Sequence, residues 1–362
     1  MRRILFFIIL FLGSLFVFQQ NAELETILAS VQNGDWRFLY LAIVVQVAWL
    51  FNVAFSYCVI YRALGLTESL WRLLLLSTAA TATNIVAPSG GMGGVAVFVS
   101  EAHRRQYSTA RTTISNLVYL LLDYTGFLAV LFVGMVLYLQ QHPFNAALGI
   151  AAVTLLGLTT LLGIFIFLGL QSEQRMGRLL LQIARGANRL SMTIKKMDAF
   201  PEEKVRAFTK DTSQGLQLLR GHPREMWLAF GLALNNRILL IAVLWLVALA
   251  FQLSLSFDAV IAGFSIGYLF FIVSPTPAGL GFVEGALALT LTAYQVPSGL
   301  ASLVTLVYRG ITFWLPLLVG LTSLQVLAGN TTFQFSKNRL TTSLSGNQPS
   351  PHTPDKAPQI GD

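Results

Sequence analysis

Long apolar runs separated by short polar connections make up most of the chain. A bilayer core of roughly 30 Å takes about 20 apolar residues per helix. Runs that fit or approach this length are Ile4–Phe18 (the shortest), Phe38–Tyr61, Asn116–Leu139, Ala146–Leu170, Trp227–Phe251 and Leu300–Leu327. Two further apolar segments, Leu73–Ser100 and Ala259–Ala293, contain proline and glycine. The pattern predicts an all-α polytopic membrane protein with about six spanning helices and two broken segments.

Each broken segment carries a glycine-rich corner, in "NIVAPSGGMGGVAVF" (Asn84–Phe98) and "FIVSPTPAGLGFVEG" (Phe271–Gly285). Non-helical backbone at membrane depth is tolerated only where protein or water surrounds it. We therefore expect two re-entrant hairpins whose tips line a cavity. The predicted tip residues are Pro88, Gly90, Gly91, Gly93, Gly94, Pro275, Pro277, Gly279 and Gly281. Their backbone amides can bind phosphate or carboxylate at a half-helix start, although any tight hairpin also needs glycines.

The charges predict the topology. Only 11% of the residues are charged, and the net charge of +8 comes from basic residues in short connections, which argues against nucleic acid as a partner. Basic residues before the first run (Arg2 and Arg3), at Arg62–Arg72 and at Arg104–Arg111 predict three cytoplasmic positions in a plasma membrane. The N-terminus is then cytoplasmic, and the start is a retained helix in preference to a cleaved signal peptide.

The connection 171–225 is the largest and most basic one, with eleven Lys and Arg against six Asp and Glu. Its stretch "MGRLLLQIARGANRLSMTIKKM" (Met176–Met197) has an apolar helical stripe, which predicts an amphipathic helix on the anionic lipids of the inner leaflet. A solvated connection is the alternative. Residues 330–362 are polar and without apolar periodicity, which predicts a disordered cytoplasmic tail.

The order helix, hairpin, helix occurs twice, at about 37–140 and 224–329. For the last helix to end in the cytoplasm, the second hairpin must enter from outside while the first enters from the cytoplasm. The two halves then form an inverted-topology repeat. In transporters of this kind the substrate site lies at the repeat interface near the bilayer midplane.

Ionisable residues inside the apolar runs are the candidate functional groups. Asp123 and Arg309 are each predicted near the bilayer centre, where a charge costs at least about 2.5–3.5 kcal/mol and requires a partner. They either pair with each other or flank a substrate path. Arg237, beside Asn236, is either central or interfacial. Glu284 is either a helix-capping carboxylate or a titratable group in the path.

Signals of catalysis are weak. The four histidines lie in connections or the tail, no metal-ligand spacing or nucleotide-binding loop is found, and the single cysteine, Cys58, excludes an intramolecular disulfide. These observations predict no metal, no cofactor and no conventional enzyme.

The motifs "PSGGMGG", "SPTPAGLGFVEGAL" and "LVYRGITFWLPLLVG" resemble the lysylphosphatidylglycerol synthase transmembrane-region family, whose members are also described as flippase-like. The resemblance implies a transmembrane domain over 1–329 that moves a phospholipid or polyprenyl-phosphate lipid between leaflets. A short polar tail stands where bifunctional members have an aminoacyl-transferase domain, so lysyl transfer is not expected. The expected partner is a lipid with an anionic headgroup, and the chain is a possible homo-oligomer. The alternative is an accessory protein or transferase of lipid or glycan synthesis, with Glu284 or Asp123 as the acid/base group.

Overall fold

The computed structural model describes residues 34–86, 92–143, 146–171, 202–274 and 276–328. Every regular element in these ranges is helical. Five helices are long and apolar enough to span a membrane: Trp36–Ala63 (α3), Thr109–Gln141 (α6), Ala146–Gln171 (α7), Pro223–Ala250 (α10) and the continuous helix Ser298–Ala328. They confirm five predicted spans, while the first, Ile4–Phe18, lies outside the described residues. The chain is an all-α multi-pass membrane protein.

Both broken segments form pairs of short helices. The first pair is Leu70–Val86 (α4) and Met92–Arg104 (α5). The second is Phe257–Val273 (α11) and Phe282–Ala293 (α12), joined through the single turn Pro277–Gly279 (η1). At 1.5 Å per residue a 17-residue helix such as α4 or α11 is only about 25 Å long. Each arm is therefore shorter than a bilayer core.

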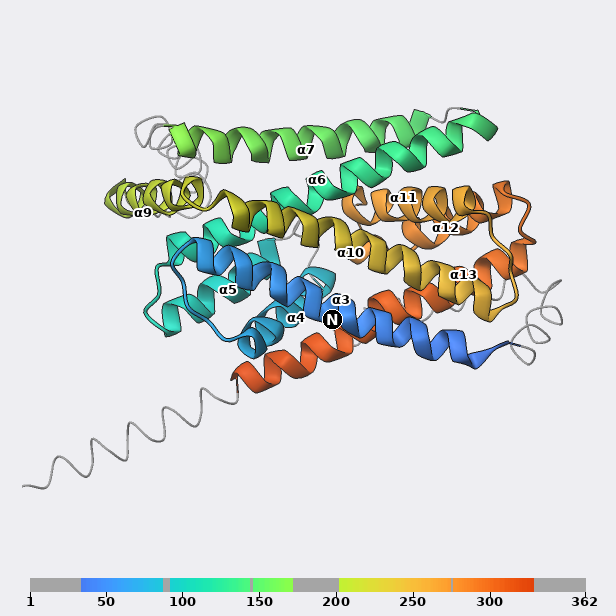
Figure 1. Ribbon diagram of the computed structural model, residues 1–362, viewed down its shortest axis with the longest axis horizontal. Helices are drawn as coiled ribbons and strands as arrows, with labels where there is room; N and C mark the ends of the chain where they lie inside the picture. The colour runs from blue at the N-terminus through green and yellow to red at the C-terminus, as the bar shows by residue number, and fades with distance from the viewer. Residues whose placement is uncertain (1–33, 87–91, 144–145, 172–201, 275, 329–362) are drawn as a thin grey trace, which may run out of the picture.

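The two halves contain the same elements in opposite directions. The helix α3, the pair α4–α5 and α6 form the first half, and α10, the pair α11–α12 and Ser298–Ala328 form the second. In Figure 1, α4 and α5 lie at the end of the molecule that holds Glu202–Arg220 (α9), and α11 and α12 lie at the other end. The Asp35 amide, just before α3, donates a hydrogen bond of 2.8 Å to the Ala250 carbonyl at the end of α10. The halves are thus inverted relative to each other.

A polar contact ties the first helices of the two halves together. The Asn52 side-chain amide on α3 donates to the Asn236 side chain (2.7 Å) and to the Leu232 carbonyl (2.9 Å), both on α10. Asn235 donates back to Asn52 at 2.9 Å. Side-chain hydrogen bonds between apolar helices fix their relative position, because an unpaired amide is costly there. The antiparallel pair α3–α10 therefore forms a fixed seam between the halves.

Apolar side chains fill the interior of each half and also cover the outside. One core cluster lies mainly between α3, α4, α5, α6 and α9. A second lies mainly between α10, α11, α12 and the first part of the last helix, Ser298–Arg309 (α13), with parts of α3, α6 and α7. Phe132, Ile150, Leu161 and Leu289 are each about 70% exposed, at 71%, 70%, 67% and 73%. Lipid chains, and not water, suit such a surface.

The end that holds α4, α5 and α9 is the basic end of the molecule. Its described basic residues are Arg62, Arg72, Arg104, Arg105, Arg111, Lys210, Arg220 and Arg224. The predicted surface helix, Met176–Met197, lies outside the described residues, as does the predicted tail 330–362, whereas the later part of the connection 171–225 is described. The described part, α9, buries Leu216 and Leu219 in the first core cluster. This part of the connection packs against the protein.

We expect Gly320→Ala to destabilise the fold, because a Cβ at Gly320 would lie 2.2 Å from the Thr78 carbonyl oxygen of α4. The two helices would have to separate, at a cost of about 1–3 kcal/mol. Gly157→Ala on α7 is the matched control, since its Cβ would meet nothing within 4 Å. Thermal unfolding in detergent should show a lower midpoint for the first variant and an unchanged or higher one for the second. Equal midpoints would contradict the close packing of α4 on the last helix.

Candidate functional site

The inner ends of the two hairpins meet at the centre of the molecule. Ile85, near the end of α4, packs in one apolar cluster with Ala278 of η1 and Phe313 of the last helix. The hairpins approach from opposite ends of the structure (Figure 1). Their contact therefore lies near the midplane, where the two halves join.

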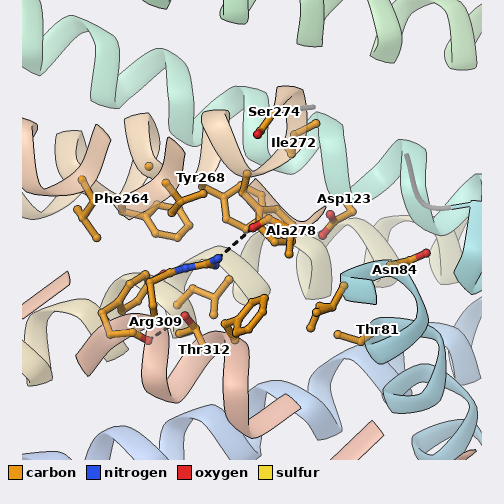
Figure 2. A pocket seen from close by; sticks show the side chains of 18 of the residues that line it. Thr81, Asn84, Asp123, Phe264, Tyr268, Ile272, Ser274, Ala278, Arg309 and Thr312 are labelled. Atoms are coloured by element: carbon orange, nitrogen blue, oxygen red, sulfur yellow. Dashed lines mark hydrogen bonds between the residues drawn. The ribbon is translucent and has the colours of Figure 1, made fainter. Parts of the chain in front are cut away.

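A cavity of about 360 Å³ lies beside this contact, and Figure 2 shows it from close by. Both hairpins and both flanking helix pairs contribute to its wall. Its polar and charged lining residues are Thr81, Asn84, Asp123, Ser274, Thr276, Arg309 and Thr312. Its aromatic lining residues are Trp49, Tyr119, Tyr124, Phe264, Tyr268, Phe271, Tyr308 and Phe313. Within the described ranges no group of three His, Cys, Asp or Glu side chains is placed to hold a metal ion.

Arg309 donates a hydrogen bond to the backbone at the break between α11 and α12 in the second hairpin. Ala278 has φ 49° and ψ 27°, a left-handed conformation that is costly for a residue with a Cβ, and its carbonyl accepts a 2.9 Å hydrogen bond from Arg309. The Arg309 Nε also donates to Glu284 Oε1 at 2.7 Å. The other Glu284 oxygen accepts from the Gly281 amide at 2.7 Å, which caps α12. One ion pair thus holds both sides of the break.

Glu284 has the capping contact that was one of its two predicted roles, and it also forms an ion pair. It caps the N-terminus of α12 and it forms an ion pair, with its side chain 13% exposed. The helix widens to a π-helical turn over Gly310–Trp314 (η2), directly after Arg309. Single π-helical turns inside α-helices are frequent at functional sites. The Arg309 guanidinium lies 4.8 Å from the centre of the Phe313 ring in that turn.

A second ion pair joins the two halves. Arg237 on α10 pairs with the Asp123 carboxylate on α6 and also donates to the Asp123 carbonyl at 3.3 Å. Its guanidinium lies 4.2 Å from the centre of the Tyr268 ring on α11. Arg237 is only 1% exposed and lies at the middle of α10. A buried charge at this depth is tolerable because carboxylate and ring both stabilise it.

Of the two alternatives for Asp123 and Arg309, the pair between them is wrong. Asp123 pairs with Arg237, and Arg309 pairs with Glu284. Arg309 instead satisfies the α11–α12 break of its own half, where Glu284 and a free carbonyl both need a donor. Asp123 and Arg309 nevertheless line the same cavity from different helices, and Figure 2 shows them on different sides of it.

Three of the predicted tip glycines, Gly94, Gly279 and Gly281, use their amides in hydrogen bonds inside the protein. The Gly94 amide in the first turn of α5 donates to the Asn84 side chain at 2.6 Å. The Gly279 amide donates to the Thr276 carbonyl, and Gly281 donates to Glu284. Backbone donors at membrane depth are thus satisfied within the hairpins themselves. The tip residues Pro88, Gly90, Gly91 and Pro275 lie outside the described residues.

Three residues of the site were not predicted from the sequence. Asn52 and Asn84 were detectable, because each is an amide side chain inside an apolar run and such a group needs a partner. Tyr268 gave no such signal, since a tyrosine in an apolar helix is ordinary. Only the packing of α11 against α10 brings its ring to Arg237.

A separate cluster of charges closes the base of the first hairpin. Glu101, 6% exposed, lies within 3.0 Å of Arg104 and 3.5 Å of Arg105 and also pairs with Arg72. Glu68 contacts Arg105 at 3.5 Å and Arg72 at 4.0 Å. Burial raises the pKa of Glu68, and Arg72 opposes that rise. The cluster holds α4 and α5 together at the basic end.

These features define a class of membrane protein: two inverted halves, each with a broken hairpin, around a central cavity that holds buried ion pairs. The model of the family "Lysylphosphatidylglycerol synthase TM region" matches residues 4–320, and the chain belongs to this family. It is also 30% identical over 125 residues to a "UPF0104 membrane protein" of Methanothermobacter thermautotrophicus. That match covers 33% of this chain and 37% of the relative.

We expect the two observed ion pairs, and not Asp123 with Arg309, to be energetically coupled. Asp123→Asn and Arg237→Gln should each cost about 3–5 kcal/mol of unfolding free energy, because each leaves a buried charge unpaired. The double variant should cost clearly less than their sum. Glu284→Gln with Arg309→Gln should behave in the same way.

The control is the cross pair, Asp123→Asn with Arg309→Gln, whose losses should add. Unfolding in detergent, followed by helical circular dichroism, gives all the free energies. Coupling in the cross pair together with additivity in the observed pairs would contradict the assignment.

Proposed function

We propose that the protein is a lipid translocator of the plasma membrane. A headgroup occupies the central cavity while its acyl chains stay in the bilayer, and the lipid passes between leaflets at the junction of the two halves. The substrate class is a phospholipid or a polyprenyl-phosphate lipid. The family match supports a lipid-related membrane role, and translocation itself is the proposal.

The observation that carries the proposal is the cavity at the repeat interface, whose largely apolar and aromatic wall contains charged and polar groups. Asp123, Arg309, Asn84 and Thr312 line it, although lipid-facing apolar residues surround the bundle. Intramembrane charged residues are expensive and usually mark a substrate path. Inverted-repeat transporters hold their substrates at this same place.

The geometry also suggests how the path would open. The contact of Ile85 with Ala278 and Phe313 is apolar and small, whereas the seam between α3 and α10 is extensive and hydrogen-bonded. Rocking of the halves about the α3–α10 seam would separate the hairpin ends and let a headgroup pass. Such rigid-body motion of repeats around a fixed site is the general mode of alternating access.

The basic end supports a cytoplasmic position for α4, α5 and α9, because short cytoplasmic connections are enriched in Lys and Arg. Anionic inner-leaflet lipids would then contact this end. With the predicted first helix, both termini would be cytoplasmic.

An enzymatic role in lipid or glycan synthesis is less well supported. It needs Asp123 or Glu284 as a proton-transferring group, but each carboxylate is bound to an arginine, and Glu284 also caps a helix. Both carboxylates are therefore already engaged in contacts that hold helices together.

The proposal predicts that the purified protein in liposomes exposes inner-leaflet lipid. Lipids with a dithionite-sensitive fluorophore on one acyl chain would be quenched beyond the outer-leaflet half of the signal, at a rate that rises with protein density. Quenching limited to the outer leaflet for every lipid tested would contradict it.

A cavity-filling variant should stop this movement without unfolding the protein. Thr81→Trp places an indole in the cavity wall, whereas Leu161→Trp adds the same group at a lipid-facing position that is 67% exposed. We expect the first to lose most of the quenching of the inner leaflet and the second to retain it, with similar melting of both. Full activity of a folded Thr81→Trp protein would place the path elsewhere.

A further inference from the structure

We propose that the cavity takes a dipolar headgroup of no net charge, with its phosphate at Arg309 and an ammonium group at Asp123. This inference rests on the proposed function and refines its substrate class. It makes Asp123 a specificity-determining residue, and it replaces the purely anionic headgroup that the sequence alone suggested.

The charges around the cavity are balanced. Asp123 and Arg309 line it, and each has an opposite charge directly behind it, in Arg237 and Glu284. The four described charges of the site therefore sum to zero. An anionic headgroup would bring an uncompensated charge into a poorly solvated space beside a carboxylate, which is costly. A phosphate and an ammonium on one headgroup keep the balance.

The Arg309 side of the cavity suits a phosphate. The guanidinium has five N–H donors, and its hydrogen bonds with Glu284 and the Ala278 carbonyl use two of them. The side chain reaches the cavity wall, and Figure 2 shows it beside Thr312 of the same helix. Arginine binds phosphate through charge-assisted, often bidentate hydrogen bonds. The chain thus supplies a cation at this side, held in place by Glu284 and the Ala278 carbonyl.

The Asp123 side of the cavity suits an ammonium group. Tyr119, Tyr124 and Tyr268 line the cavity together with the carboxylate. Aromatic rings with a nearby carboxylate are the surroundings that bind organic ammonium ions. The Tyr268 ring already holds one cation, the Arg237 guanidinium at 4.2 Å. A carboxylate can accept about four hydrogen bonds, so Asp123 can bind an ammonium while it keeps Arg237.

The test compares headgroups on the same labelled acyl chains in the liposome assay. The probes are phosphatidylethanolamine, its N-acetylated form and phosphatidylglycerol. Acetylation removes only the ammonium charge, so it isolates the group assigned to Asp123. We expect phosphatidylethanolamine to move at least about tenfold faster than either anionic lipid, a ratio equivalent to about 1.4 kcal/mol.

The double variant Asp123→Asn, Arg237→Gln removes the carboxylate without leaving an unpaired arginine, and it should lose this preference. Tyr124→Leu, which keeps every charge, should reduce the preference and provides a second readout if the double variant does not fold. Asp123→Glu is the matched control and should retain the preference.

The outcomes separate this inference from the proposed function. Equal or faster movement of the anionic lipids by the native protein would overturn the dipolar headgroup and leave translocation standing. An unchanged preference in the folded double variant would overturn the role of Asp123. The absence of movement for all three lipids would overturn the proposed function itself.

Discussion

The bond network of Arg309 is the interaction on which the centre of the structure depends. A helix broken inside a membrane exposes a carbonyl on one side of the break and amides on the other, and lipid can satisfy neither. Arg309 donates to the Ala278 carbonyl and pairs with Glu284, which in turn accepts from the Gly281 amide. Without this chain of contacts the left-handed Ala278 and the start of α12 would have no compensation. The second hairpin can therefore end near the midplane and need not cross it.

Ending there is what creates the site. Ile85 near the end of α4 contacts Ala278 at the break of the second hairpin, and the cavity lies beside this contact. Asp123 and Arg237 then join α6 of one half to α10 of the other across the same region. The two ion pairs therefore have different roles. Arg309 with Glu284 stabilises the helix break within the second half, and Arg237 with Asp123 links the two halves. One residue of each pair, Arg309 or Asp123, lines the cavity.

The sequence predicted the architecture better than the site, for a physical reason. Span length, proline and glycine corners and basic connections are local signals, and they were sufficient for the spans, the hairpins and the inverted order. They also singled out Asp123, Arg237, Glu284 and Arg309, because a charge in an apolar run is costly wherever it lies. Pairing depends on which helix faces which, and similar depths made Asp123 and Arg309 the natural but wrong pair. The amides of Gly94, Gly279 and Gly281 were misassigned because hydrogen bonds inside each hairpin were not visible in the pattern.

The proposed translocation requires the two halves to separate at the hairpin contact when a lipid passes. Ile85 and Ala278 lie in one apolar cluster. Both can be replaced by cysteine in a Cys58→Ala background, and the two cysteines can then be joined by a short, reducible thiol cross-linker. Lipid movement in liposomes would be measured before cross-linking, after it and after reduction. We predict that movement stops in the cross-linked protein and returns on reduction. Unchanged lipid movement in the fully cross-linked protein would contradict this separation of the halves.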